Sequence, residues 1–560
     1  MDFKYHIVSS MCKVFPDGAN QRELKEKNLT GLKGETLSFQ IAYYWSGEGK
    51  NYGSLKVSSP IKDHVHVRMV NLVPCEYPCH PKRDDGYLAT VPGMYPDRLS
   101  QIPQQGFPLI AGQWRCLWID IETDMTIEAG IYPVILRLES NGMILCDAKM
   151  TCTVIDVPLP KLPIAYTEWF HSDCLAEYYQ TEVFSDYYWE IVESFVRAAA
   201  KHKCNMLLTP IFTPPLDTAI GKERLTVQLV DVTVSSPDPG SPQNPHYEFG
   251  FSNFHKWVNM ALECGIEYFE LSHLFSQWGA KAAPKVMALK DGVYQQIFGW
   301  ETDASGSTYR EFLHQFLTAL KGELDKMGIA SRTYFHISDE PPMDELPSYR
   351  RAWESIAEDL KGYKIIDALS DYDFYQEGLV QRPVCAVDAL KPFLENRPEH
   401  LWCYYCTAQC VDVPNHFIAL PGCRTRILGV LLYKYRLDGF LHWGYNFYHS
   451  ELSHYRIDPY QCTDAAGAFP SGDPFLVYPG KDGKPEGSIR QMLLDEAMSD
   501  YCALTALENL AGRDAVLKLV NEETVTFDKY PQEETYLFRL RQKVNHALQR
   551  GCRKIIKSDD

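Results

Sequence analysis

The sequence predicts an α/β protein in which an all-β sandwich precedes a (β/α)8 TIM barrel. Residues 1–157 contain short runs of alternating polarity separated by Gly, Asn, Asp and Pro, with no helix-period segment of any length. From residue 158 to residue 560, strand-like segments alternate with amphipathic helices, the pattern of a parallel sheet wrapped by helices. We therefore expect an N-terminal sandwich over 1–157 and a (β/α)8 barrel with a helical C-terminal extension over 158–560.

The sandwich is predicted from alternating runs at 36–44, 54–57, 64–70, 114–121, 131–138 and 143–154. The stretch 75–103 is rich in Pro, Asp and Tyr, and we expect a long loop that lies against the barrel. Three prolines between 156 and 163 predict an extended linker.

The barrel strands are predicted to be short and apolar, as expected of a sheet that is covered on both faces. Eight segments qualify: 165–170, 205–209, 266–271, 333–337, 364–368, 384–387, 401–405 and 439–443. Segments of helical period fall at 187–203, 253–264, 309–327, 349–360, 424–437 and 488–509.

Composition and charge restrict the classes of function. Of the 560 residues, 45% are hydrophobic and 23% are charged, which is ordinary for a soluble globular protein. The net charge of −18 argues against nucleic acid or an anionic membrane as a partner. We find neither an N-terminal basic region followed by an apolar run nor a membrane-spanning window, so we expect reduced thiols and a cytoplasmic location.

Two adjacent carboxylates follow the fourth predicted barrel strand. The run 333–337 leads into Asp339 and Glu340, and Pro341 and Pro342 prevent the strand from continuing. Catalytic groups of such barrels lie at the carboxyl ends of the strands. Two carboxylates this close cannot both ionise freely, so we expect one pKa to rise and to leave a proton for donation at neutral pH. An arbitrary Asp-Glu pair is more often a cap and a solvated side chain, but this setting favours a catalytic pair.

The other strand ends are also rich in acids, amides, imidazoles and rings. Any single His or Trp is more often part of a core than a ligand, so the coincidence over several strand ends carries the prediction. The strand-end residues include Glu168, His171, Asp173, Asp217, His273, Gln277, Trp278, Asp371, Tyr372, Tyr404, Tyr405, His442, Trp443 and Asn446.

The segment Phe335-His-Ile-Ser-Asp-Glu-Pro resembles the catalytic strand of glycoside hydrolase family 123. The blocks Gly439-Phe-Leu-His-Trp-Gly-Tyr-Asn-Phe-Tyr448 and Gly472-Asp-Pro-Phe-Leu-Val-Tyr-Pro-Gly480, with Ser488-Ile-Arg490, are similar to further parts of that family. Gly34-Glu-Thr-Leu-Ser-Phe-Gln40 is similar to the start of its accessory sandwich. The resemblance covers most of the chain.

The resemblance implies a retaining β-N-acetylgalactosaminidase that works by substrate assistance. The 2-acetamido oxygen of the substrate would attack the anomeric carbon, and Asp339 would stabilise the acetamido N–H of the oxazolinium ion. Glu340 would protonate the leaving oxygen and then activate water. Trp443 resembles the family's ring at the barrel floor, and either Tyr405 or Tyr372 would donate to the acetamido oxygen. By position alone, the further hydroxyl-binding candidates are His171, Asp173, Gln277, Trp278 and Asn446.

Other functions stay open at this point. The same acid pair would serve N-acetylglucosamine-type or substituted glycosides, and a non-catalytic carbohydrate-binding barrel would fit if either carboxylate were absent. A metal-dependent hydrolase needs His and Asp ligands at several strand ends, where only His171 and Asp173 come close. Cys403, Cys406 and Cys410 form C-x2-C-x3-C, but the triplet begins inside a predicted strand and favours buried thiols. We therefore expect a glycoside or oligosaccharide substrate, no metal and no cofactor, and we leave a homo-oligomer open.

Overall fold

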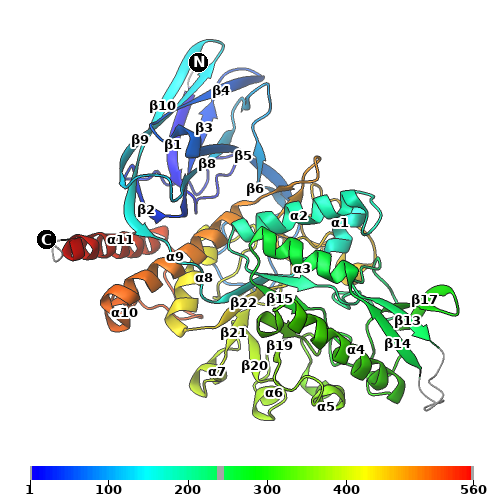
Figure 1. Cartoon of the computed structure of the whole chain (residues 1–560). Coiled ribbons are helices and arrows are strands. Elements are labelled where there is room, and N and C mark those ends of the chain that lie inside the picture. Colours follow the sequence, from blue (N-terminus) through cyan, green and yellow to red (C-terminus); the bar gives the residue numbers. More distant parts are fainter. Residues whose placement is uncertain (1–2, 236–244, 557–560) are drawn as a thin grey trace.

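The computed structural model describes residues 3–235 and 245–556 (Figure 1). Its N-terminal part is a sandwich of two five-stranded sheets, in the orders β1-β3-β8-β5-β6 and β2-β10-β9-β4-β7. The strands are β1 (Phe3–Ser9), β2 (Asn28–Lys33), β3 (Glu35–Trp45), β4 (Lys50–Ser58), β5 (Val65–Cys75), β6 (Gly93–Gln101), β7 (Phe107–Ile110), β8 (Trp114–Thr123), β9 (Gly130–Ser140) and β10 (Met143–Pro158). All six predicted strands are present, and the predicted sandwich is confirmed.

The sandwich core lies between the two sheets because alternate residues of each strand point inward. Phe39 and Ile41 on β3 and Leu136 and Leu138 on β9 are fully buried in this one cluster. Side chains of opposite parity on β3 and β8, such as Ala42 and Trp118, point out of the sandwich toward the barrel.

The prediction of a loop over 75–103 is wrong in part. Residues Gly93–Gln101 form β6, which pairs antiparallel with β5. Pro96 and Asp97 hid this strand, since neither residue favours sheet structure. The stretch does lie against the barrel, as predicted, because Leu88 N donates a hydrogen bond of 2.9 Å to Ala419 O.

Eight parallel strands close the barrel in chain order, as the sequence predicts. They are β11 (Ala165–Glu168), β12 (Met206–Thr209), β15 (Tyr268–Leu271), β18 (Thr333–Phe335), β19 (Lys364–Leu369), β20 (Arg382–Ala386), β21 (Trp402–Tyr404) and β22 (Gly439–His442). The change from sandwich to barrel falls between Pro158 and Ala165, so β10 extends into the predicted linker.

The helices of the chain surround the barrel and form its C-terminal extension (Figure 1). They are α1 (Ser172–Tyr178), α2 (Asp186–Lys201), α3 (Ser252–Cys264), α4 (Ser307–Lys326), α5 (Leu346–Ile356), α6 (Asp373–Gln376), α7 (Lys391–Glu395), α8 (Gly422–Tyr435), α9 (Ile489–Ala511), α10 (Arg513–Val520) and α11 (Glu534–Ile556). Each of the six segments of predicted helical period contains a helix. No helix in the described parts of the chain is long and apolar enough to cross a membrane.

A second sheet is inserted between β12 and β18 and projects from the barrel (Figure 1). Its strands, in the order β14-β13-β16-β17, are β13 (Asp231–Ser235), β14 (His246–Gly250), β16 (Val286–Lys290) and β17 (Val293–Phe298). Sequence patterning missed these strands, since many of their residues are exposed and the alternation is weak.

The sandwich and the barrel share buried ion pairs. Arg490 on α9 binds Asp97 on β6 through two hydrogen bonds of 2.9 and 2.8 Å, and both side chains are fully buried. Arg541 on α11 binds Glu35 on β3 and Asp500 on α9. These contacts fix the sandwich against the helical side of the barrel.

Candidate active site

A small cleft of about 170 Å³ opens at the carboxyl ends of the barrel strands. Asp339 and Glu340 lie in it together with aromatic rings and short polar side chains. The lining residues are Trp169, Leu216, Asp217, Gln277, Trp278, Asp339, Glu340, Ala368, Tyr404, Cys406, Thr407, Leu441, Trp443 and Phe469.

The backbone at the acid pair explains why two neighbours face one cleft. Successive side chains of a strand point to opposite faces, but Glu340 has φ +39° and so leaves the strand conformation. The loop after β15 holds this turn, since Trp278 N donates to Asp339 O at 2.8 Å. Ser338 Oγ in turn donates to Ser276 O at 2.8 Å. β18 already ends at Phe335, so the strand is shorter than predicted, and Pro341 and Pro342 after the turn prevent it from resuming.

Both carboxyl groups of the pair have raised pKa values. Burial and the neighbouring charge of Glu340 raise the pKa of Asp339 well above its usual range. Burial raises the pKa of Glu340, although the hydrogen bond from the Tyr404 hydroxyl opposes this shift. A pair of this kind can hold a proton at neutral pH and give it to a leaving group.

Tyr404, rather than Tyr405, is the tyrosine that reaches the cleft from β21. The Tyr404 hydroxyl donates to Glu340 Oε1 at 2.5 Å. Tyr405 is fully buried on the other side of the strand, where its hydroxyl bonds His416 Nδ1 at 3.1 Å. The prediction of Tyr405 as an acetamido donor is therefore corrected, because neighbours on a strand face opposite ways.

Trp443, Trp278 and Gln277 line the cleft, as their predicted binding roles require. The indole N–H of Trp443 donates to Asp473 Oδ2 at 3.1 Å, which fixes the ring at the cleft wall. Trp278 is 39% exposed and has φ +57°, so its ring stands at the cleft mouth. These rings offer apolar faces to a sugar.

The other predicted binding residues lie outside the cleft lining. His171 and Asn446 are buried and bond each other through the His171 backbone at 2.9 and 3.0 Å. Asp173 binds the guanidinium of Arg224 through both of its oxygens. Tyr372 stands at the start of α6 and contacts Tyr375 and Phe393. None of these four residues belongs to the cleft lining, and their binding roles stay predictions.

A buried imidazole lies below the acid pair. His336 is bracketed by Glu270 Oε1 at 2.5 Å and Asp367 Oδ1 at 3.1 Å, and all three side chains are fully buried. Burial lowers its pKa, but the hydrogen bonds to Asp367 and Glu270 outweigh this effect and raise the pKa to about 9. The resulting positive charge favours the ionised form of Asp339.

This arrangement predicts a pH-dependent contribution to stability. The folded pKa of about 9 exceeds the unfolded value near 6.5, so the stabilisation is complete below pH 6.5 and is lost as the pH rises through 9. We expect the free energy of unfolding of the wild type to fall by up to about 3 kcal/mol more than that of His336→Gln over this window. Urea unfolding of both proteins at pH 6.5 and pH 9 measures the difference. Equal pH dependences would contradict the charged imidazole.

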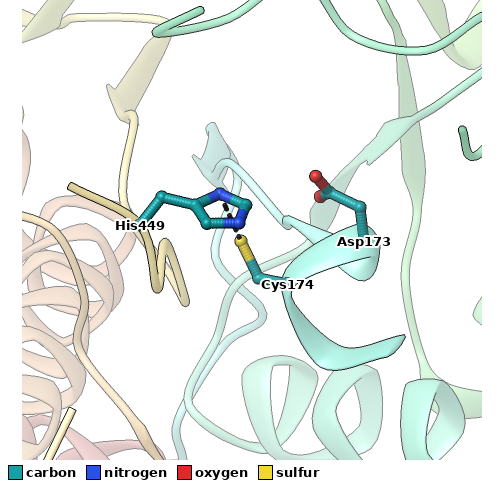
Figure 2. A group of neighbouring side chains, drawn as sticks. All are labelled: Asp173, Cys174 and His449. Atoms are coloured by element: carbon teal, nitrogen blue, oxygen red, sulfur yellow. Dashed lines mark hydrogen bonds between the residues drawn. The ribbon is translucent and has the colours of Figure 1, made fainter. Parts of the chain in front are cut away.

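Two groups of side chains in the described residues have atoms close enough for a metal ion, namely Asp173-Cys174-His449 and His273-His336-Asp367. Figure 2 shows Asp173 and Cys174 at the start of α1, with His449 facing Cys174. Arg224 uses both oxygens of Asp173, and its cationic head stands at this group. The rings of His273 and His336 stack with centroids 4.3 Å apart, so their in-plane lone pairs do not meet at one point. Neither donor set fits an ion well.

The structure also adds residues whose roles the sequence did not assign. Asp217 stands at the second strand end and lines the cleft. Tyr404 is the sequence neighbour of the predicted Tyr405. Which of the two side chains faces the cleft depends on the inward or outward alternation along the strand. Glu270 and Asp367 belong to the barrel strands β15 and β19, where their charge in an apolar run was the available signal.

Fold and site together define the class of the protein. A closed barrel with a raised-pKa acid pair at a strand end, in a cleft lined by rings, is the arrangement of a glycoside hydrolase. A family model, the catalytic domain of glycoside hydrolase 123, matches residues 169–507, which is more than half of the chain. The chain belongs to glycoside hydrolase family 123.

Comparison with solved structures agrees on the fold. A family 123 glycoside hydrolase from Clostridium perfringens, studied for glycolipid glycan hydrolysis, aligns with a TM-score of 0.75 and 15% identity over 100% of both chains. A GH5 xyloglucanase from Bacteroides ovatus in complex with a XXXG heptasaccharide gives a TM-score of 0.30 and 9% identity, with 85% of this chain and 99% of that chain covered. The second likeness is too weak to carry an argument. No curated protein matches the chain.

Proposed function

We propose that the enzyme removes a terminal β-linked 2-acetamido sugar, N-acetylgalactosamine in the first instance, with retention and by substrate assistance. The adjacency of Asp339 and Glu340 in one small cleft is the observation that carries this proposal. A conventional retaining enzyme places two carboxyl groups about 5–5.5 Å apart on either side of the glycosidic bond. Two carboxyl groups on consecutive residues at one turn suit a different mechanism, in which one acts as the acid, the other stabilises charge, and the substrate supplies the nucleophile.

In the proposed first step, the acetamido oxygen attacks the anomeric carbon while Glu340 gives its proton to the leaving oxygen. Asp339 accepts a hydrogen bond from the acetamido N–H and stabilises the positive charge of the oxazolinium ion. Tyr404 holds the Glu340 carboxyl by its hydroxyl. In the second step, Glu340 takes a proton from water, which opens the ring and restores the β-configuration.

The aromatic lining supports binding of one sugar ring. Trp443 is fixed by Asp473 and offers its face to the cleft, where a sugar and its acetamido methyl group would pack. The cleft of about 170 Å³ beside the acid pair is where this sugar would bind.

A panel of 4-nitrophenyl β-glycosides tests the proposal. We expect release of nitrophenol from the N-acetylgalactosaminide and none from the galactoside, because the galactoside lacks the acetamido nucleophile. Faster cleavage of the N-acetylglucosaminide would assign the alternative sugar configuration. Cleavage of the plain galactoside would overturn substrate assistance, and binding without cleavage of any member would indicate a barrel that only binds.

A further inference from the structure

Asp217 is a third carboxylate in the cleft, and one of its two oxygens is available to a ligand. Its Oδ2 accepts a hydrogen bond from Leu452 N at 3.1 Å. Its backbone oxygen accepts a bond from Ser453 Oγ at 2.7 Å, so a segment after β22 fixes the residue from behind. Within the described parts of the chain, no group donates to Oδ1, while the side chain lines the cleft.

Gln277 provides a second acceptor next to Asp217. Its Nε2 donates to the backbone oxygen of Thr218 at 3.0 Å, which fixes the orientation of the amide. Its Oε1 is buried and has no hydrogen-bond partner among the described residues, although the side chain is only 5% exposed. A buried acceptor without a partner costs about 1–3 kcal/mol, so this atom is expected to be satisfied by a bound donor.

Among the described residues, no cationic side chain lines the cleft, and the charged imidazole of His336 below it is already paired with Glu270 and Asp367. Asp217, Asp339 and Glu340 line the cleft, and none of the described lining residues is Lys, Arg or His. Arg224 lies near enough to affect the pKa of Asp217, but it is buried and binds Asp173 with its guanidinium. A ligand that brings hydrogen-bond donors and no negative charge suits this surface.

We propose that Asp217 and Gln277 form an acceptor pair that binds hydroxyl groups of the terminal sugar and restricts the enzyme to sugars without sulfate or carboxylate groups. This assignment rests on the proposed function for the identity of the sugar. Each hydroxyl donates to one fixed oxygen, and a sulfate in the same place would face carboxylates without a counter-charge.

The test compares wild type, Asp217→Asn and Gln277→Met with Asp344→Asn as the matched control. Asp344 is exposed and follows β18, outside the cleft lining, so the control also removes one carboxylate charge near the rim. The substrates are 4-nitrophenyl N-acetyl-β-galactosaminide and its 4-O- and 6-O-sulfates. Calorimetric titration with free N-acetylgalactosamine measures binding without turnover, and circular dichroism checks folding.

We expect Asp217→Asn to raise KM and the Kd for the free sugar by about 10- to 100-fold, with kcat changed much less. Gln277→Met should act in the same direction, and the control should match the wild type. The wild type should cleave at least one of the two sulfated substrates at least about 100-fold less efficiently than the neutral one, and Asp217→Asn should narrow this ratio. The comparison of neutral and sulfated substrates uses the wild type alone, so it tests the proposal even if a variant does not fold.

The outcomes separate this inference from the proposed function. If folded Asp217→Asn keeps the KM and Kd of the wild type, Asp217 and Gln277 do not bind the sugar hydroxyls. Equal cleavage of the neutral and both sulfated sugars by the wild type would contradict the acceptor pair in the same way. Neither result would contradict the proposed reaction. Loss of kcat alone would also contradict the acceptor pair, because it would make Asp217 a reacting group. If the free sugar binds in a way that depends on Asp217 but no substrate is cleaved, the acceptor pair is supported and the proposed hydrolysis is contradicted. A wild type that neither binds nor cleaves would overturn both.

Discussion

Glu340→Gln is expected to lower kcat/KM for an alkyl β-N-acetylgalactosaminide by between about 10²- and 10⁴-fold, the usual contribution of a general acid. An alkoxide is a poor leaving group and needs the proton that Glu340 carries. Glutamine keeps the size of the side chain and can still accept a hydrogen bond from Tyr404, so the cleft should retain its shape. We expect KM to change little.

The dependence on leaving group makes this result specific. With a 2,4-dinitrophenyl glycoside the first step requires no proton, so the loss should be smaller, and added azide should restore part of the rate because it needs no general base. Asp344→Asn is the matched control, since Asp344 is exposed four residues further along the chain. An equal loss for alkyl and dinitrophenyl substrates, without rescue by azide, would contradict the assignment of Glu340 as acid and base.

The largest expected effect on stability comes from Arg490. Its guanidinium binds both oxygens of Asp97 and donates to the backbone oxygens of Gly472 and Phe475. Replacing it by Met would leave the buried Asp97 carboxylate without its ion-pair partner. Among the described residues, the Tyr478 hydroxyl would still donate to it, and the buried ammonium of Lys13 would be the nearby positive charge. Removal of one partner from such a pair costs about 3–5 kcal/mol, so we expect a loss of this size in the free energy of unfolding.

Urea unfolding of Arg490→Met measures this loss, with Arg22→Met as the control. Arg22 also forms an ion pair, with Glu533, but both side chains are mostly exposed, and such pairs contribute little. The double variant Asp97→Asn/Arg490→Met should recover part of the stability, because it removes the unpaired charge. A single variant as stable as the control would show that Asp97 takes up a proton or finds water instead.

The arrangement of strands and helices could be predicted because it depends on hydrophobic period, which the sequence displays directly. β6 was missed because Asp97, which interrupts its apolar pattern, is balanced by Arg490, far away in the chain. Pairings over such a distance leave no local signal.

The candidate site was predictable to the level of a strand end and not to the level of a side chain. Asp339 and Glu340 could be found because they stand between an apolar strand and two prolines. The choice between Tyr404 and Tyr405 depends on the phase of a three-residue strand, and a shift by one residue reverses every side chain. The bond between His336 and Glu270 joins separate strands, so only the closed barrel brings these residues together.

The outer face of the sheet β1-β3-β8-β5-β6 has a consequence for how this enzyme is inherited. Many of its apolar side chains join the core that surrounds the barrel, and the buried ion pairs of Asp97 and Glu35 cross the same boundary. A gene rearrangement that separated the sandwich from the barrel would expose apolar surface on both fragments and favour aggregation. The Clostridium perfringens structure aligns over the whole of both chains, so its fold also contains both parts. We therefore expect the sandwich and the barrel to be inherited together as one folding unit.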